Sequence, residues 1–300
     1  MSGVQLPDTL VLGVGGTLGE AWMRGVLTGL EAASDLDFRD CEYLLGTSAG
    51  SIVAATLVSG RSLDAGDRAA RAWSAAAGGD GAVETRGLGS AARAAFRFGT
   101  VAASPLAPLA FAGLEPAGRL ARAVALSRAP RPTRRLNALA GHLDSLGAEF
   151  DGRLRIAAVD RGRGARVLFG APGAPVPSVR DAVLASCAVP WLFAAVEIDG
   201  REYVDGGVWS PTNLDAAPGG RGAHVLCLAP TAAAGPFRTF TNAALVAEEM
   251  ALRARGMRLR VIAPDADAAA AIGTNLMDRD RVEDVVDAGF AQGLALTREP

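Results

Sequence analysis

Several residue types that carry chemistry are scarce in this chain. Its 300 residues include only two histidines and three cysteines, and aromatic residues make up 5%. The cysteines, Cys41, Cys187 and Cys227, are odd in number and far apart, so they predict neither a disulfide framework nor a C-x-x-C metal site. Such usage is typical of a reducing compartment, and we therefore expect a cytoplasmic protein.

Basic excess and long apolar segments are also missing. The net charge of −2 argues against nucleic-acid binding, since no surplus of positive charge exists to neutralise phosphates. The first residues lack the pattern of a signal peptide. The longest mainly apolar stretch, 101–114, is interrupted by Pro105 and Pro108 and is too short to span a bilayer. We predict a soluble protein, with peripheral contact with a membrane as the alternative location.

Apolar runs alternate along the chain between strand-like and helix-like spacing. We expect strands at 9–14, 43–45, 154–159, 166–169, 196–198, 202–204, 224–229 and 258–263. We expect helices at 20–33, 51–57, 63–77, 88–98, 116–126, 134–150, 179–187, 237–255, 265–272 and 281–296. This alternation predicts an α/β fold with a mainly parallel sheet. The length fits a single domain over 8–300, in which 78–135 form a helical insertion or cap.

The motif with the most chemical content is Gly46-Thr47-Ser48-Ala49-Gly50. An apolar run precedes it and a helix-forming run follows it. Strand, G-x-S-x-G and helix together are typical of a nucleophile elbow, in which the serine occupies a tight turn between very small neighbours. Taken alone, the five residues slightly favour a simpler structure, a serine N-cap. Other parts of the chain must decide between the two.

A glycine-rich loop, Gly13 to Gly19, lies between the first expected strand and the first expected helix. Glycines at this place let backbone amides converge on an anion, with a helix N-terminus behind them. Attack on an ester needs such preorganised donors for its oxyanion. The competing hypothesis is a dinucleotide fingerprint with Asp35 or Asp37 as the ribose acid. The spacing disfavours it, because Leu18 occupies the third glycine position.

A serine nucleophile also needs a base, and histidines are few. His142 lies in a helical run, and His224 opens an apparent strand. A Ser48, Asp205, His224 triad would follow the order of the α/β-hydrolases, but that fold has several strands before its elbow and this chain has one. We favour Asp205 as a direct general base. An Asx turn is the structural alternative for Asp205-Gly206-Gly207. For other acids we expect solvated or capping roles, among them Glu20, Asp160, Asp181 and Asp199.

In this order, the glycine loop, G-T-S-A-G and D-G-G resemble the patatin-like phospholipase family. The stretches 185–190 and 198–207 are similar to the family's segment leading to its aspartate, and the landmarks extend from about residue 10 to about 213. The resemblance implies a three-layer α/β/α fold with a mainly parallel central sheet. It also implies a lipid or other acyl-ester substrate, a serine–aspartate dyad without histidine, and no metal or cofactor.

The resemblance assigns a role to each motif. Ser48 would accept the acyl group, and Asp205 would activate first Ser48 and then the deacylating water. Backbone amides of Gly15, Gly16 and Thr17 would form the oxyanion hole. The glycines that give both turns room would be Gly46, Gly50, Gly206 and Gly207. The implied activity is hydrolysis of lipid carboxylic esters, of phospholipase or esterase type. The alternatives are an acyltransferase using the same acyl-enzyme and a catalytically weak lipid-binding scaffold.

The chain departs from the family at the glycine loop, which usually reads G-G-G-x-R/K-G. Here Val14 replaces a glycine and Leu18 replaces the basic residue. The loss of a positive charge bears on the lipid head group more than on ester hydrolysis, because backbone amides form the oxyanion hole whatever the side chain. Arg24, the nearest candidate to compensate, is more than one helical turn away.

Overall fold

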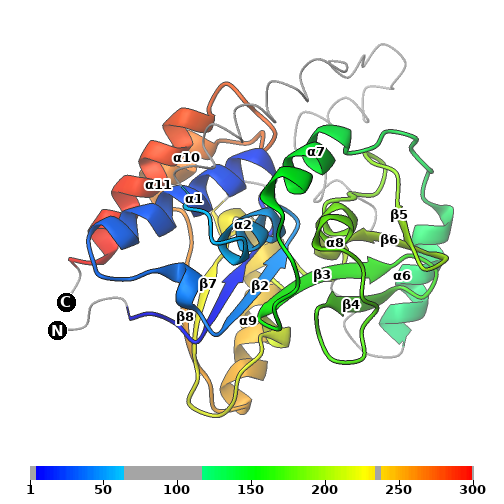
Figure 1. Cartoon of the computed structure of the whole chain (residues 1–300), viewed down its shortest axis with the longest axis horizontal. Coiled ribbons are helices and arrows are strands. Elements are labelled where there is room, and N and C mark those ends of the chain that lie inside the picture. Colours follow the sequence, from blue (N-terminus) through cyan, green and yellow to red (C-terminus); the bar gives the residue numbers. More distant parts are fainter. Residues whose placement is uncertain (1–4, 64–116, 234–237, 299–300) are drawn as a thin grey trace.

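The strands form one mixed sheet whose centre is parallel (Figure 1). The computed structural model describes residues 5–63, 117–233 and 238–298. Within them, the sheet has eight strands in the order β5-β6-β3-β2-β1-β7-β8, and β4 pairs with β3 off this path. The strands are β1 (Thr9–Leu12), β2 (Tyr43–Thr47), β3 (Leu154–Asp160), β4 (Ala165–Phe169), β5 (Val196–Ile198), β6 (Arg201–Asp205), β7 (His224–Leu228) and β8 (Arg258–Ile262). The pairs among β3, β2, β1, β7 and β8 are parallel, and the others are antiparallel.

Helices cover both faces of the sheet, which gives three layers (Figure 1). One face carries α1 (Gly16–Ala32), α2 (Ala49–Val58), α7 (Asn137–Leu146), α8 (Val179–Ser186), α10 (Ala266–Ile272) and α11 (Val282–Leu296). The other carries α6 (Ala117–Arg128) and α9 (Arg238–Ala254). The prediction of an α/β fold with a mainly parallel sheet is confirmed.

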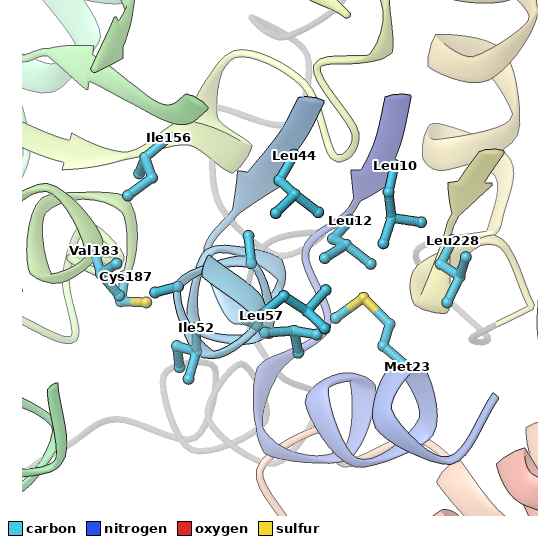
Figure 2. Packing of buried hydrophobic residues seen from close by; sticks show 14 of the residues in the cluster. Leu10, Leu12, Met23, Leu44, Ile52, Leu57, Ile156, Val183, Cys187 and Leu228 are labelled. Carbon is cyan, nitrogen blue, oxygen red and sulfur yellow. The ribbon is translucent and has the colours of Figure 1, made fainter. Parts of the chain in front are cut away.

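The central strands are apolar without interruption because both of their faces are buried. All four residues of β1 are buried, and successive side chains enter different cores. Leu10 and Leu12 join the core under α1 and α2, whereas Val11 joins the core under α9. Figure 2 shows the first core, where the strand residues meet α1, α2 and α8; its labelled members are Leu10, Leu12, Met23, Leu44, Ile52, Leu57, Ile156, Val183, Cys187 and Leu228.

Several predicted boundaries shift, each for a local reason. The expected strand 9–14 ends at Leu12, and the expected helix 20–33 begins at Gly16. Gly16 has φ +59 and turns the chain straight into the helix. The expected helix 134–150 spans only Asn137–Leu146, where Gly147 forms a left-handed C-cap. The expected helices 63–77 and 88–98, and the part of the expected cap 78–135 that precedes residue 117, lie almost entirely outside the described residues.

Helix α1 is fixed by close backbone packing against α11. A Cβ at Gly25 would lie 2.3 Å from the carbonyl oxygen of Val286, and one at Gly29 would lie 2.3 Å from that of Phe290. Only glycine permits this approach. It holds the helix whose N-terminus bears the glycine loop.

Two strand ends that bear sequence motifs meet on β3. Thr47, the last residue of β2, pairs with Ala157, and Asp205, the last residue of β6, pairs with Ala158. Adjacent residues of one strand therefore bring the G-T-S-A-G turn and the D-G-G turn together. In the described part of the chain, no helix is both long and apolar enough to cross a membrane.

Candidate active site

Ser48 occupies a strained turn between β2 and α2. Its φ of 52° and ψ of −121° are rare for a residue with a side chain. The turn has no room beside it: a Cβ at Gly46 would lie 2.5 Å from Ser51 Cα, and one at Gly50 would lie 2.1 Å from the carbonyl oxygen of Leu12. Ser48 is the N-cap residue of α2, but its side chain makes no capping hydrogen bond to the described residues of that helix.

The backbone of Ser48 is held on both sides by serine hydroxyls. Its N–H donates to Ser186 Oγ at 2.8 Å, and Ser186 Oγ donates in turn to the carbonyl oxygen of Ala157 at 2.7 Å. Its carbonyl oxygen accepts from Ser51 Oγ at 2.6 Å. Ser186 and Ser51 are both fully buried. These bonds stabilise a backbone conformation that the local sequence alone would not keep.

Asp205 lies beside this turn, at the end of β6. Its Oδ1 accepts from the Gly207 N–H at 2.7 Å, and the Ser48 hydroxyl lies close enough to the carboxyl to act on its pKa. Burial raises the pKa of the carboxyl to about 7, and the Gly207 amide and Ser48 hydroxyl act to lower it. The bond to Gly207 is an Asx turn, so the structural alternative and the contact with Ser48 coexist in one carboxyl group.

Three amides of the glycine loop, at the start of α1, have no hydrogen-bond partner within the described part of the chain. Leu18 N–H donates to Leu276 at 2.9 Å, and Gly19 N–H donates to Gly15 at 2.8 Å. The N–H groups of Gly15, Gly16 and Thr17 make no hydrogen bond to any described residue. Unpaired amides at a helix N-terminus are suited to bind an anion. The buried Thr17 Oγ1 likewise has no partner among the described residues.

Leu18, where the family has a basic residue, serves here as an apolar anchor. Its side chain is fully buried in the main core. The loop that follows α10 closes over this point, since Leu276 accepts the Leu18 amide and Met277 Sδ would lie 2.9 Å from a Cβ at Gly16. Arg24 donates to the Leu63 carbonyl at 2.6 Å and 3.2 Å instead of supporting the loop. Leu18 is therefore held at this point by packing and by its backbone bond to Leu276.

The two histidines do not join this group. His224 begins β7, its N–H donates to Asp8, and its ring lies 3.2 Å from Arg258. That is the amino end of the parallel strands, whereas the Ser48 turn follows their carboxyl ends. His142 lies in α7, where burial and the charges of Arg24 and Arg61 lower its pKa. The triad alternative is therefore wrong.

Two of the other acids are buried. Glu20 has neither of the expected roles, solvated or capping, whereas Asp160 accepts the Arg163 N–H at 2.9 Å and so has the capping role. Glu20 is 7% exposed and Asp160 is 4% exposed. Burial raises the pKa of Glu20 to about 7, against the lowering effect of Arg24. Glu20 and Arg24 are four residues apart, a spacing that is typical of an ion pair on an exposed helix face. Only the packing of α1 shows that both side chains are buried. Among the described residues, no group of three or more His, Cys, Asp or Glu side chains could hold a metal ion.

Asp181 and Asp199 have roles that local sequence patterns predict, whereas the role of Ser186 depends on a distant contact. Asp181 lies in the first turn of α8, where Ser178 caps its N–H, and Asp199 is an exposed turn residue at φ 50°. Both agree with the expected roles. Ser186 has no sequence signal of its own, because its bond to Ser48 joins residues 138 positions apart.

The three-layer fold thus brings together a strained serine turn, a buried aspartate turn and a glycine-rich loop. The model of the patatin-like phospholipase family matches residues 10–218. The chain therefore belongs to the patatin-like phospholipase family, a family of lipid acyl hydrolases. The part after residue 218, which supplies α9, α10 and α11, lies beyond the match.

Solved structures with similar chains include VipD from Legionella pneumophila and the type III effector protein ExoU. VipD is 14% identical, with a TM-score of 0.49, and the match covers 99% of this chain and 67% of VipD. ExoU is 16% identical, with a TM-score of 0.43, and the match covers 99% of this chain and 53% of ExoU. A comparison with curated proteins finds no match.

Proposed function

We propose that this protein hydrolyses lipid carboxylic esters through an acyl-Ser48 intermediate, with Asp205 as the general base. The observation that supports this most is the position of the buried Asp205 carboxyl beside the strained Ser48 turn, since β2 and β6 end opposite adjacent residues of β3. No histidine lies between them. A serine hydroxyl becomes nucleophilic only when a positioned base removes its proton, and Asp205 meets that requirement.

The reaction follows from these positions. The Asp205 carboxylate takes the proton of Ser48 Oγ as the oxygen attacks the ester carbonyl carbon. Amides of Gly15, Gly16 and Thr17 bind the resulting oxyanion. Collapse expels the alcohol, which takes the proton from Asp205. Water then attacks the acyl-enzyme while Asp205 accepts its proton, and the second collapse returns that proton to Ser48 Oγ as the acid leaves.

The pH dependence of the proposed reaction follows from the buried carboxyl. Only the carboxylate form can accept a proton, and the pKa of Asp205 is about 7. We expect kcat/KM to rise with pH through about 7 and to reach a plateau above it. An ordinary aspartate would give a plateau already above about pH 5.

The proposal includes the domain organisation and the location. One catalytic domain would span 8–300, with pocket walls from 78–135. The helices after residue 218 belong to it, because α11 packs on α1 and the Leu276 carbonyl binds the glycine loop. The substrate would be a lipid ester reached by peripheral contact with a membrane.

The decisive test is hydrolysis of a short p-nitrophenyl ester by Ser48→Ala and Asp205→Asn. Both variants should lose more than about a thousandfold in kcat/KM while circular dichroism shows an intact fold. Ser127→Ala and Asp199→Asn change exposed residues and serve as matched controls with unchanged activity. Activity that survives Ser48→Ala would refute the proposal.

The two alternatives can be separated with the same preparations. A fluorophosphonate probe should label Ser48 in the wild-type protein, and failure to label would favour the lipid-binding scaffold. Partition of the acyl group between water and an added alcohol measures transfer. Release of free acid as the main product at millimolar alcohol is the expected result for a hydrolase.

A further inference from the structure

A short segment after the D-G-G turn contacts every part of the proposed site. In residues 210–214, the Pro211 carbonyl accepts from Val14 N–H in the glycine loop at 2.8 Å. The methyl group of Thr212 would lie 3.3 Å from a Cβ at Gly13. Asn213 contacts both the serine turn and the aspartate turn. The segment thus touches the glycine loop, the serine turn and the aspartate turn.

The amide of Asn213 joins the neighbours of both proposed catalytic residues. Its Nδ2 lies 3.2 Å from Thr47 Oγ1, 3.3 Å from the carbonyl oxygen of Gly206 and 2.9 Å from that of Ser210. Thr47 directly precedes Ser48, and Gly206 directly follows Asp205. The side chain is fully buried, so water does not compete for these bonds.

Asn213 is itself held firmly. Its backbone has φ 53°, in the left-handed region that asparagine tolerates better than most residues. Its Oδ1 accepts from Arg166 Nη1 at 3.3 Å. Arg166 makes two further bonds to the Asp215 carboxylate, at 2.6 Å and 2.8 Å. The amide therefore has a fixed orientation, with its oxygen toward Arg166 and its nitrogen toward the two turns.

Helix α9 supports the same segment from outside the family match. The buried carboxyl of Glu248 accepts from Thr212 Oγ1 and, at 3.2 Å, from Leu214 N–H. These two residues flank Asn213 on either side. Glu248 therefore fixes the backbone from which the Asn213 side chain extends.

Sheet pairing alone does not set the distance between the two side chains. Thr47 and Asp205 pair with adjacent residues of β3, but Ser48 lies one residue beyond the pairing, in a strained turn. A displacement of about 1 Å at a reacting group can cost about a hundredfold in rate. A single amide that binds next to both residues limits this displacement.

We propose that Asn213 is a positioning residue that holds the serine turn and the aspartate turn in register through Thr47 and Gly206. The inference rests on the proposed function of Ser48 and Asp205. It assigns Asn213 no contact with substrate. Its effect should therefore appear in the chemical step rather than in substrate binding.

The test compares Asn213→Gly, Thr47→Val and the double variant. Glycine keeps the left-handed backbone and removes the amide, and valine keeps the shape of Thr47 and removes its acceptor. Each single variant should lower kcat about 10-fold to 100-fold while KM stays within about twofold. The double variant should lose less than the product of the single losses, because both remove the same bond. The rate of fluorophosphonate labelling of Ser48 should fall in parallel.

Thr56→Val is the matched control, since Thr56 is buried in α2 and its hydroxyl, among the described residues, bonds the Ile52 carbonyl of its own helix. It should leave kcat within about twofold. The inference is overturned if Asn213→Gly keeps full kcat, if the single losses multiply, or if Thr56→Val loses as much. Ser48→Ala separates the two hypotheses: full activity there refutes the function, whereas its loss together with an unaffected Asn213→Gly refutes only the positioning role.

Discussion

Ser48 and Asp205 lie where β2 and β6 end opposite adjacent residues of β3, yet each is in an unfavourable state of a different kind. Ser48 has a strained backbone at φ 52°, held by small neighbours and two serine hydroxyls. Asp205 has an ordinary backbone, with φ −47° and ψ 133°, and its cost is the burial of a carboxyl whose pKa rises to about 7. The nucleophile thus depends on steric confinement, and the base depends on a dry environment.

The steric confinement of Ser48 should be disturbed most by a substitution at Gly50. Gly50→Ala would place a Cβ 2.1 Å from the Leu12 carbonyl oxygen, and backbone on both sides prevents relief. We expect a loss of about 3 kcal/mol or more in the free energy of unfolding, measured by urea denaturation. Gly141→Ala in α7 has open space around it and should gain about 0.5–1 kcal/mol. Equal effects at both sites would contradict the tight turn.

Because the Asp205 carboxyl is buried, we expect its ionisation to destabilise the fold at high pH. The unfolded carboxyl ionises near 3.8 and the folded one near 7, so stability is lost as pH rises between these values. Asp205→Asn removes this cost and still accepts the Gly207 N–H. At pH 8 it should be more stable than wild type by about 2–4 kcal/mol.

Thermal unfolding from pH 4 to pH 8 measures the difference in stability between Asp205→Asn and the wild-type protein. It should shrink to a small remainder near pH 4, where the folded carboxyl is protonated and the unfolded one, with a pKa of 3.8, is about half protonated. A gain that stays constant across this range would show that Asp205 is not desolvated as described. Asp199→Asn, in an exposed turn, is the control variant measured in parallel.

Ser186 connects the serine turn to β3, because its hydroxyl accepts from the Ser48 amide and donates to the Ala157 carbonyl. Ser186→Ala would leave the buried Ser48 N–H without its acceptor, at a cost of about 1–3 kcal/mol in unfolding free energy. Ester hydrolysis should fall about 10-fold to 100-fold as the turn shifts. Ser186→Cys, which keeps a weak acceptor, should lose less of both. Unchanged activity in Ser186→Ala would mean that the turn is held by its glycines alone.

The smallest expected effect comes from the strained backbone of Ser48, which two substitutions at this position can measure separately from its hydroxyl. Ser48→Gly and Ser48→Ala both remove the hydroxyl, but only glycine adopts φ 52° without strain. Ser48→Gly should be more stable than Ser48→Ala by about 1 kcal/mol in chemical denaturation. The reverse order would mean that the turn is not strained.

Sequence patterns predicted the strands and helices well, because apolar periodicity reports burial directly. The Gly16 turn moved the start of α1, since a backbone angle that only glycine favours is not visible in periodicity. Glu20 was misjudged for a related reason. Its carboxyl is buried by packing of α1 against distant elements, which no local pattern encodes.

By itself, the sequence determined the alternating sheet architecture, the family, and the pairing of a G-T-S-A-G turn with a D-G-G turn. These features depend on local periodicity and on short motifs with fixed spacing. Only the tertiary structure decided that no histidine joins Ser48, that Leu18 packs where a charge is usual, and that Ser186 and Asn213 hold the two turns. The physical reason is distance along the chain: a hydrogen bond between residues more than a hundred positions apart exists only once the sheet has brought them together.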